Sequence, residues 1–219
     1  MPLCGHILFF TASRTIYLKQ IFLFFLLLVS LLQAQEQDDR FSLRLGYGQA
    51  SIQDLGEILA GDFSKHPKDL NVLFVDGGYL LKKDIFELPI DIYIKSGLAY
   101  FDEYTFDDSM ELTLYIKAYW NLDFFDNRVR LGFAEGVSYV SDVLETEYYE
   151  ALEDNDKTSK FLNYLDISID FDFGRLISYK PLYETYIGCA LKHRSGVFGL
   201  YNGVSGGSNY NTFYLEKNF

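Results

Sequence analysis

Two side chains near the end of the sequence could together hydrolyse an ester. His193 and Ser195 are separated by a single residue, so they share one face if this segment is a β-strand. A serine hydroxyl is a weak nucleophile until a neighbouring base takes its proton, and a neutral imidazole can be that base. The pair therefore indicates acyl transfer to water, provided that a third group orients the imidazole.

Candidates for the remaining groups of such a site lie nearby. Counting back from Phe219 at period two places Asn209 on the corresponding face of the last strand. An asparagine can orient a histidine but cannot stabilise the imidazolium by charge. Backbone N–H donors for an oxyanion would come from three glycines, Gly196, Gly206 and Gly207. Four glutamates that the sequence does not place are alternative acids: Glu135, Glu145, Glu147 and Glu150.

The elements that must position these residues alternate between apolar and polar side chains. In segment 111–120 one face carries Leu112, Leu114, Ile116, Ala118 and Trp120, and the other carries Glu111, Thr113, Tyr115, Lys117 and Tyr119. This period is typical of a strand with two different faces. Eight segments follow the pattern: 40–50, 70–80, 88–101, 110–121, 128–140, 161–173, 182–194 and 209–219.

The same alternation would suit a soluble sandwich or a ligand-carrying barrel in the periplasm. Three further features favour a membrane barrel: an export signal, a terminal strand that ends in Phe219, and aromatic residues crowded at strand ends as in interfacial girdles. The expected fold is therefore all-β, an eight-stranded antiparallel transmembrane β-barrel in the outer membrane. An interior of that size is filled by side chains and leaves no useful pore.

The N-terminus reads as a signal peptide over residues 1–34. Lys19 precedes an apolar run of about 12 residues, shorter than the roughly 20 needed to cross a bilayer as a helix. Leu32-Gln33-Ala34 supplies the small residue expected before the cut. The barrel domain would then be residues 35–219.

Charged residues on the polar face should pair inside the barrel, in a network whose role is structural. Its expected members are Arg44, Asp91, Lys95, Glu111, Lys117, Arg130, Asp166, Asp170, Glu184, Lys192 and Glu216. The connections after the second, fourth and sixth strands are short, which predicts periplasmic turns there and both termini in the periplasm. Segment 196–208 is then an external loop, as is the acidic stretch 145–156, which is expected to be solvated.

The composition limits what the protein could bind. The formal net charge of -12 disfavours nucleic acid as a partner. Once Cys4 is removed with the signal peptide, Cys189 is alone, so no disulfide framework or cysteine zinc site is expected. No metal or cofactor is expected, and the oligomeric state stays open.

The C-terminal stretch resembles the lipid A 3-O-deacylase (acyloxyacyl hydrolase) family of outer-membrane enzymes. The resemblance is carried by His193-Arg194-Ser195, which matches the family's His-x-Ser motif, and by the architecture of the whole mature chain. It implies Ser195 as nucleophile, His193 as base and lipid A of lipopolysaccharide as substrate. The family has a glutamate where this chain has Asn209, and an asparagine where it has Gly196.

Two functions follow as hypotheses. The first is an esterase that removes an ester-linked acyl chain of lipid A, with Lys192 and Arg194 binding lipid headgroups. The second is a non-catalytic small barrel that stabilises the membrane or binds lipopolysaccharide or a surface partner. The first requires His193 and Ser195 to touch, with an orienting group within hydrogen-bond reach, whereas the second should tolerate changes at both residues.

Overall fold

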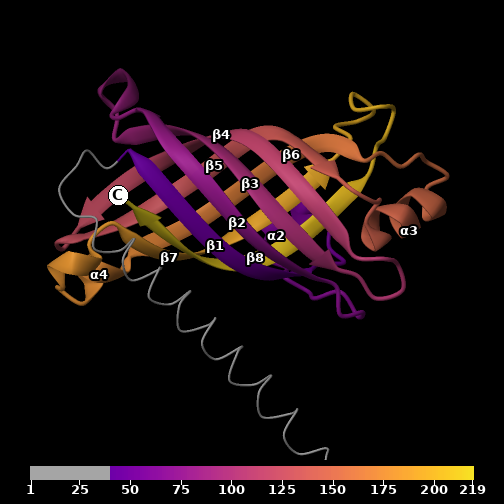
Figure 1. Ribbon diagram of the computed structural model, residues 1–219, viewed down its shortest axis with the longest axis horizontal. Coiled ribbons are helices and arrows are strands. Elements are labelled where there is room, and N and C mark those ends of the chain that lie inside the picture. Colours follow the sequence, from indigo (N-terminus) through magenta and orange to yellow (C-terminus); the bar gives the residue numbers. More distant parts are fainter. Residues whose placement is uncertain (1–39) are drawn as a thin grey trace, which may run out of the picture. The chain divides into compact units, whose positions relative to one another are not determined.

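Eight strands and a few short helices make up the part of the chain that the computed structural model describes, residues 40–219. The expected signal peptide, residues 1–34, lies outside the described residues. The strands are β1 Phe41–Ala50, β2 Asn71–Lys82, β3 Ile90–Asp102, β4 Ser109–Phe124, β5 Asn127–Val140, β6 Phe161–Asp172, β7 Thr185–Ser195 and β8 Gly207–Asn218. Figure 1 shows them wrapped side by side.

Each strand pairs antiparallel with the next, and β8 pairs with β1 to close the barrel. The predicted fold class is therefore confirmed, and the predicted segments agree with the strands to within a few residues. The largest difference is at the β4–β5 turn, which is tighter than expected. Only Phe125 and Asp126 connect the two strands, both with positive φ (48° and 59°), as a two-residue hairpin turn requires.

The polar face of every strand lies inside the barrel and the apolar face outside. On β4, Leu112 and Leu114 are 54% and 52% exposed, whereas Lys117 is fully buried. A soluble barrel would show the opposite arrangement, because its apolar side chains would leave water for the interior. An apolar outer surface is the arrangement of a barrel whose wall faces lipid. No helix in residues 40–219 has the length and apolar character to cross a membrane.

Ion pairs fill the interior, as the polar face predicts. Arg44 bridges Asp76 at 2.7 Å and Asp166 at 2.9 Å, and Lys117 also pairs with Asp166. Further buried pairs are Lys95–Glu216 at 2.8 Å, Arg130–Asp170 at 2.8 Å and Lys192–Glu111 at 2.6 Å. Asp76 is a member that the sequence did not suggest. The predicted member Asp91 accepts a hydrogen bond from Asn121 at 2.9 Å, and no ion pair of Asp91 is found in the described residues.

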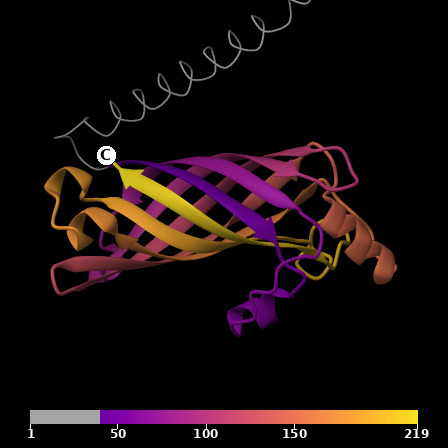
Figure 2. The ribbon, with the colours of Figure 1, turned by 90° about the horizontal axis from the view of Figure 1, so that it is seen from below.

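The two ends of the barrel differ. One end carries α4 (Phe173–Leu176) with the short helices η1 (Ile85–Glu87) and η2 (Lys180–Leu182). The other carries the β1–β2 segment with α2 (Leu55–Leu59), the β5–β6 segment with α3 (Glu145–Glu153), and the β7–β8 loop. Figure 2 shows α2 beside the barrel wall near the end that carries α3. On the predicted orientation this second end is external.

The interpretation of stretch 145–156 as a solvated loop is wrong for its first half. Glu145 is fully buried and accepts hydrogen bonds from Lys68 Nζ at 2.6 Å and Thr105 N–H at 2.7 Å. Glu147 points into the barrel mouth, where Arg194 Nε and Ser208 Oγ donate to it at 2.8 Å each. These contacts anchor α3 to the barrel and could not be read from local sequence.

A buried carboxyl beneath α3 makes this end of the barrel sensitive to pH. Burial raises the pKa of Glu103 to about 7, although Glu145 N–H donates to its carboxylate at 3.1 Å. Burial also opposes ionisation of Glu145, but the hydrogen bonds from Lys68 and Thr105 outweigh it and lower the pKa of Glu145 to about 2. Between these two values Glu145 is ionised and Glu103 is protonated.

The packing of α3 should therefore strengthen as the pH falls from above 7 towards 5, because Glu103 holds its proton more tightly in the folded state. Below the ordinary glutamate range the contribution of Glu145 is lost instead as the pH falls towards 2. Hydrogen exchange of the α3 amides, corrected for intrinsic rates, should be slower at about pH 6 than at about pH 8. Glu103→Gln should remove that difference, and an unchanged difference in the variant would contradict the assignment.

Candidate functional site

His193, Ser195 and Asn209 meet on the outer wall of the barrel. His193 and Ser195 lie on the outward face of β7, and both are half-buried. Asn209 is on the outward face of β8, directly opposite His193 in the β7–β8 register. The three residues therefore occupy the shared face that strand parity predicts.

Asn209 determines which nitrogen of His193 carries the proton. Asn209 Nδ2 donates to the carbonyl oxygen of Gln53 at 3.0 Å, which fixes the orientation of the amide. Asn209 Oδ1 then faces His193 Nδ1 at 2.7 Å, and as an acceptor it requires a proton on that nitrogen. His193 Nε2 is left unprotonated, which is the form of imidazole that can take a proton from a serine.

Ser195 shares the outward face of β7 with that base, but the described residues show no hydrogen bond between the two side chains. Two residues along a strand place its Cα roughly 7 Å from that of His193, with both side chains on one face. In the described part of the chain the Ser195 hydroxyl makes no hydrogen bond, so it is free to rotate towards His193. Catalytic hydrogen bonds are often long before a substrate binds.

A cavity of about 1040 Å³ opens over the three residues. Apolar side chains line parts of it: Ile52 and Leu55 from the β1–β2 segment, and Val197 and Phe198 from the β7–β8 loop. Its acidic lining residues are Asp54, Glu135, Glu145, Glu150, Glu153 and Asp154, and no lysine or arginine is among the described residues that line it. The cavity is large enough for an acyl chain and is negatively charged.

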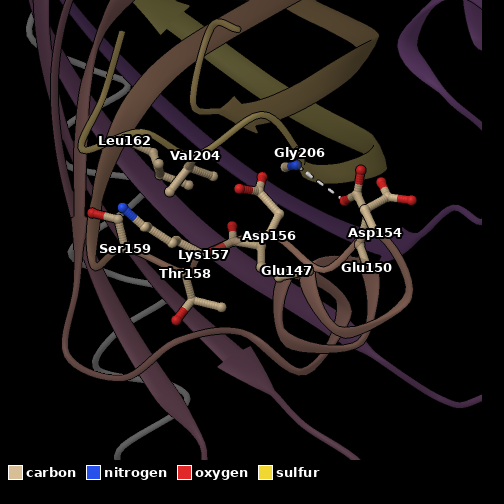
Figure 3. Close-up of a pocket in the computed structure, with 12 residues that line it drawn as sticks. Glu147, Glu150, Asp154, Asp156, Lys157, Thr158, Ser159, Leu162, Val204 and Gly206 are labelled. Carbon is tan, nitrogen blue, oxygen red and sulfur yellow. Dashed lines mark hydrogen bonds between the residues drawn. The ribbon is translucent and has the colours of Figure 1, made fainter. Parts of the chain in front are cut away.

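The expected oxyanion donors are already engaged. Gly196 N–H donates to the carbonyl oxygen of Gly206 at 2.9 Å, and Gly207 N–H donates to Glu150 Oε2 at 3.0 Å. Figure 3 shows Glu150 close to Gly206, with a dashed line from the backbone there to the carboxylates of the β5–β6 segment. Ser205 N–H donates to Asp156 at 2.6 Å, and the Gly206 backbone also lowers the pKa of Asp156. These backbone groups hold the loop against α3, so the oxyanion role expected of them is not supported by the geometry.

The headgroup role expected of Lys192 and Arg194 is also wrong. Both side chains point into the barrel, where they are 3% and 1% exposed. Lys192 pairs with Glu111 and Arg194 pairs with Glu147. They alternate with His193 along β7, so the parity that places the histidine outside places its two neighbours inside.

Among the alternative acids, Glu145, Glu147 and Glu150 are committed to holding α3 and the β7–β8 loop. Glu135 is different, because it lies exposed on the outward face of β5 and lines the same cavity as His193. Sequence reasoning missed Asn163, which donates to Glu135 Oε1. The feature that could have indicated it is a polar amide at an outward-facing position of β6, between the apolar residues Phe161 and Leu165.

Removing the Asn209 amide should slow any hydrolysis that His193 supports. Asn209→Leu loses the hydrogen bond that fixes the imidazole, a contribution of about 1.4 kcal/mol, or about tenfold in kcat. Asn211→Leu is the matched control, because Asn211 occupies the next outward position of β8 and pairs with Leu191 rather than His193. Equal rates for wild type and Asn209→Leu would show that Asn209 does not orient the base.

No family model matches the chain, and no curated protein matches it. Among solved structures, the outer membrane enzyme PagL shares 10% identity over 81% of this chain and 99% of its own, with a TM-score of 0.56. Neisserial surface protein A shares 10% over 84% and 100% (TM-score 0.47), and the N-terminal β-barrel domain of Pseudomonas aeruginosa OprF shares 7% over the same fractions (TM-score 0.44). At 10% identity the likeness to PagL shows the fold alone, the barrel of an outer-membrane protein.

Proposed function

We propose that this chain is an outer-membrane esterase that hydrolyses an ester-linked acyl chain of lipid A in the outer leaflet. The observation that carries the proposal is the hydrogen-bonded series from Gln53 through Asn209 to His193, which makes Nε2 the basic nitrogen of an imidazole on the same strand face as Ser195. The resemblance of His193-Arg194-Ser195 to the lipid A 3-O-deacylase motif supports it. The likeness in fold to PagL, an outer membrane enzyme, agrees with it.

The location of the site suits a lipid substrate. His193 and Ser195 face outward from a wall whose neighbouring surface is apolar, so a membrane lipid could reach them laterally without leaving the bilayer. Export by residues 1–34 and insertion with α3 outside would place the site at the outer leaflet.

The reaction follows the pattern of serine esterases. Ser195 Oγ attacks the ester carbonyl carbon while His193 Nε2 takes the hydroxyl proton. The imidazolium then gives that proton to the sugar oxygen that leaves the ester, and the acyl group stays on Ser195. A water molecule gives a proton to the same imidazole and attacks the acyl-serine, and the imidazolium returns that proton to Ser195 Oγ as the fatty acid leaves.

The second candidate is a non-catalytic barrel of the same fold, with a structural or lipopolysaccharide-binding role. The engaged N–H groups of Gly196 and Gly207 favour it, because they leave the site without the expected oxyanion donors. The negative charge of the cavity lining offers nothing to the lipid A phosphates, which favours the structural role over lipopolysaccharide binding at this cavity.

Mass spectrometry of lipid A from cells that express the protein, beside cells that do not, separates the two candidates. The esterase should remove the mass of one hydroxyacyl chain, and a lipophilic fluorophosphonate should label the purified protein at Ser195. Unchanged lipid A with the barrel correctly inserted, together with no label on Ser195, would overturn the esterase and leave the non-catalytic barrel.

A further inference from the structure

Glu135 is a carboxylate among the outward-facing residues of β5, where its neighbours Leu131, Phe133, Val137 and Tyr139 carry no charge. It lies exposed on the outward face of β5. Apart from Asp102 at the end of β3, it is the only acidic residue at an outward-facing strand position in residues 40–219. Ionisable groups on a lipid-facing surface are costly, so such a residue is by default a candidate for function.

Asn163 holds this carboxylate in place. Asn163 Nδ2 donates to Glu135 Oε1 and also to the carbonyl oxygen of Gly136 at 3.2 Å. The side chain is 5% exposed and lies opposite Ser195 in the β6–β7 register. Both amide hydrogens are directed to β5, so Asn163 has none left for an oxyanion, and its contacts serve to position Glu135.

Glu135 and His193 belong to one row across the wall. The register runs from Glu135 on β5 to Leu165 on β6 and then to His193 on β7. Two strand spacings separate their Cα atoms, roughly 10 Å. Only the uncharged Leu165 lies between them in the row, and both residues line the same cavity.

We propose that Glu135 is a positioning residue that stabilises the His193 imidazolium, a role that the neutral Asn209 cannot perform. The inference rests on the proposed esterase function and identifies the negative charge that would stabilise the imidazolium in that reaction. When Ser195 Oγ loses its proton to His193 Nε2, the new positive charge faces the Glu135 carboxylate across Leu165.

Other ionisable groups surround the cavity and define the control. They are Asp54 and His66 from the β1–β2 segment and Glu145, Glu150, Glu153 and Asp154 from the β5–β6 segment. Glu153 is the matched comparison, because it is an exposed glutamate of the same cavity that lies at the end of α3 rather than in the row of His193. Glu153→Gln removes the same charge as Glu135→Gln.

The decisive measurement is the protonation of the His193 ring, followed by NMR of the full mature barrel in lipid nanodiscs with labelled histidine. A His193→Gln variant assigns the signal. In Glu135→Gln the titration midpoint should move about one unit to lower pH, because the imidazolium loses a nearby negative charge. Glu135→Asp should restore most of the midpoint, and Glu153→Gln should leave it unchanged.

The second readout is hydrolysis of the acyl ester. Glu135→Gln should lower kcat by about tenfold with KM unchanged, and the acidic limb of the rate profile should move with the midpoint. An unmoved midpoint in a Glu135→Gln barrel that folds, judged by circular dichroism, would overturn the proposal. A moved midpoint in a protein that hydrolyses no ester would support the electrostatic link and overturn the esterase function instead.

Discussion

Ser195→Ala is expected to abolish ester hydrolysis, with kcat/KM falling by at least about 10³-fold. The hydroxyl is the only group on the outward face of β7 that can form an acyl intermediate next to His193 without a change of backbone. Without it, water would have to attack directly, assisted by the base alone. His193→Ala should cost a similar factor, because the serine then has no acceptor for its proton.

The two substitutions should not add, since they disable one chemical unit. Ser205→Ala is the matched control: Ser205 lines the same cavity but lies in the β7–β8 loop, and it should retain full activity. Release of fatty acid from purified lipid A in mixed micelles measures all five proteins: the wild type, the two single variants, their double variant and the control. Retention of more than about a tenth of the wild-type rate in Ser195→Ala would refute a Ser195 nucleophile.

Strand parity accounts for what could be predicted about the site. Because side chains alternate faces, the outward apolar pattern of β7 places His193 and Ser195 together outside, and counting back along β8 places Asn209 beside them. The same alternation places Lys192 and Arg194 inside, so their expected contact with headgroups contradicted the pattern that located the histidine. Alternation therefore predicts correctly which of these side chains face outward and which face inward, and the error at Lys192 and Arg194 came from setting it aside.

Contacts between segments far apart in sequence could not be predicted. The β1–β2 segment supplies the Gln53 carbonyl that orients Asn209, across 156 positions of the chain. The β5–β6 segment folds back as α3, and its Glu150 occupies the Gly207 N–H that the sequence offered to an oxyanion. Alternation along a strand does not show which strand residues a loop will contact. These loop contacts determine which groups around His193 remain available to a substrate.

Register explains why Glu135 could be noticed but not placed. Its outward parity on β5 follows from the sequence, yet its row depends on the stagger of three strands. A shift of two residues in either pairing would keep its side chain outside and move it about 7 Å along the wall from His193. The register of the closed barrel, which no local sequence pattern encodes, therefore places the Glu135 carboxylate in the same row as His193.

The largest effect on stability is expected at Arg44, the fully buried centre of the interior network. Its guanidinium pairs with Asp76 and Asp166, donates to the Tyr115 hydroxyl at 3.1 Å and stacks 5.1 Å from the Phe74 ring. Arg44→Met keeps much of the side-chain volume but leaves Asp76 buried without its cation. Removing one partner of a buried pair costs about 3–5 kcal/mol, so the free energy of unfolding should fall by that amount.

Asp76→Asn in the Arg44→Met background should recover part of the loss, because the stranded charge is then gone. Lys65→Met is the comparison for an ion pair in water: Lys65 and Asp69 are 47% and 78% exposed, and the change should cost less than about 1 kcal/mol. Urea unfolding from lipid vesicles can be followed through Trp120, the single tryptophan, which lies on the outer wall. Equal losses of unfolding free energy in Arg44→Met and Lys65→Met would mean that the interior pairs contribute no more than a surface pair. The interior network would then not be a main source of the stability of the barrel.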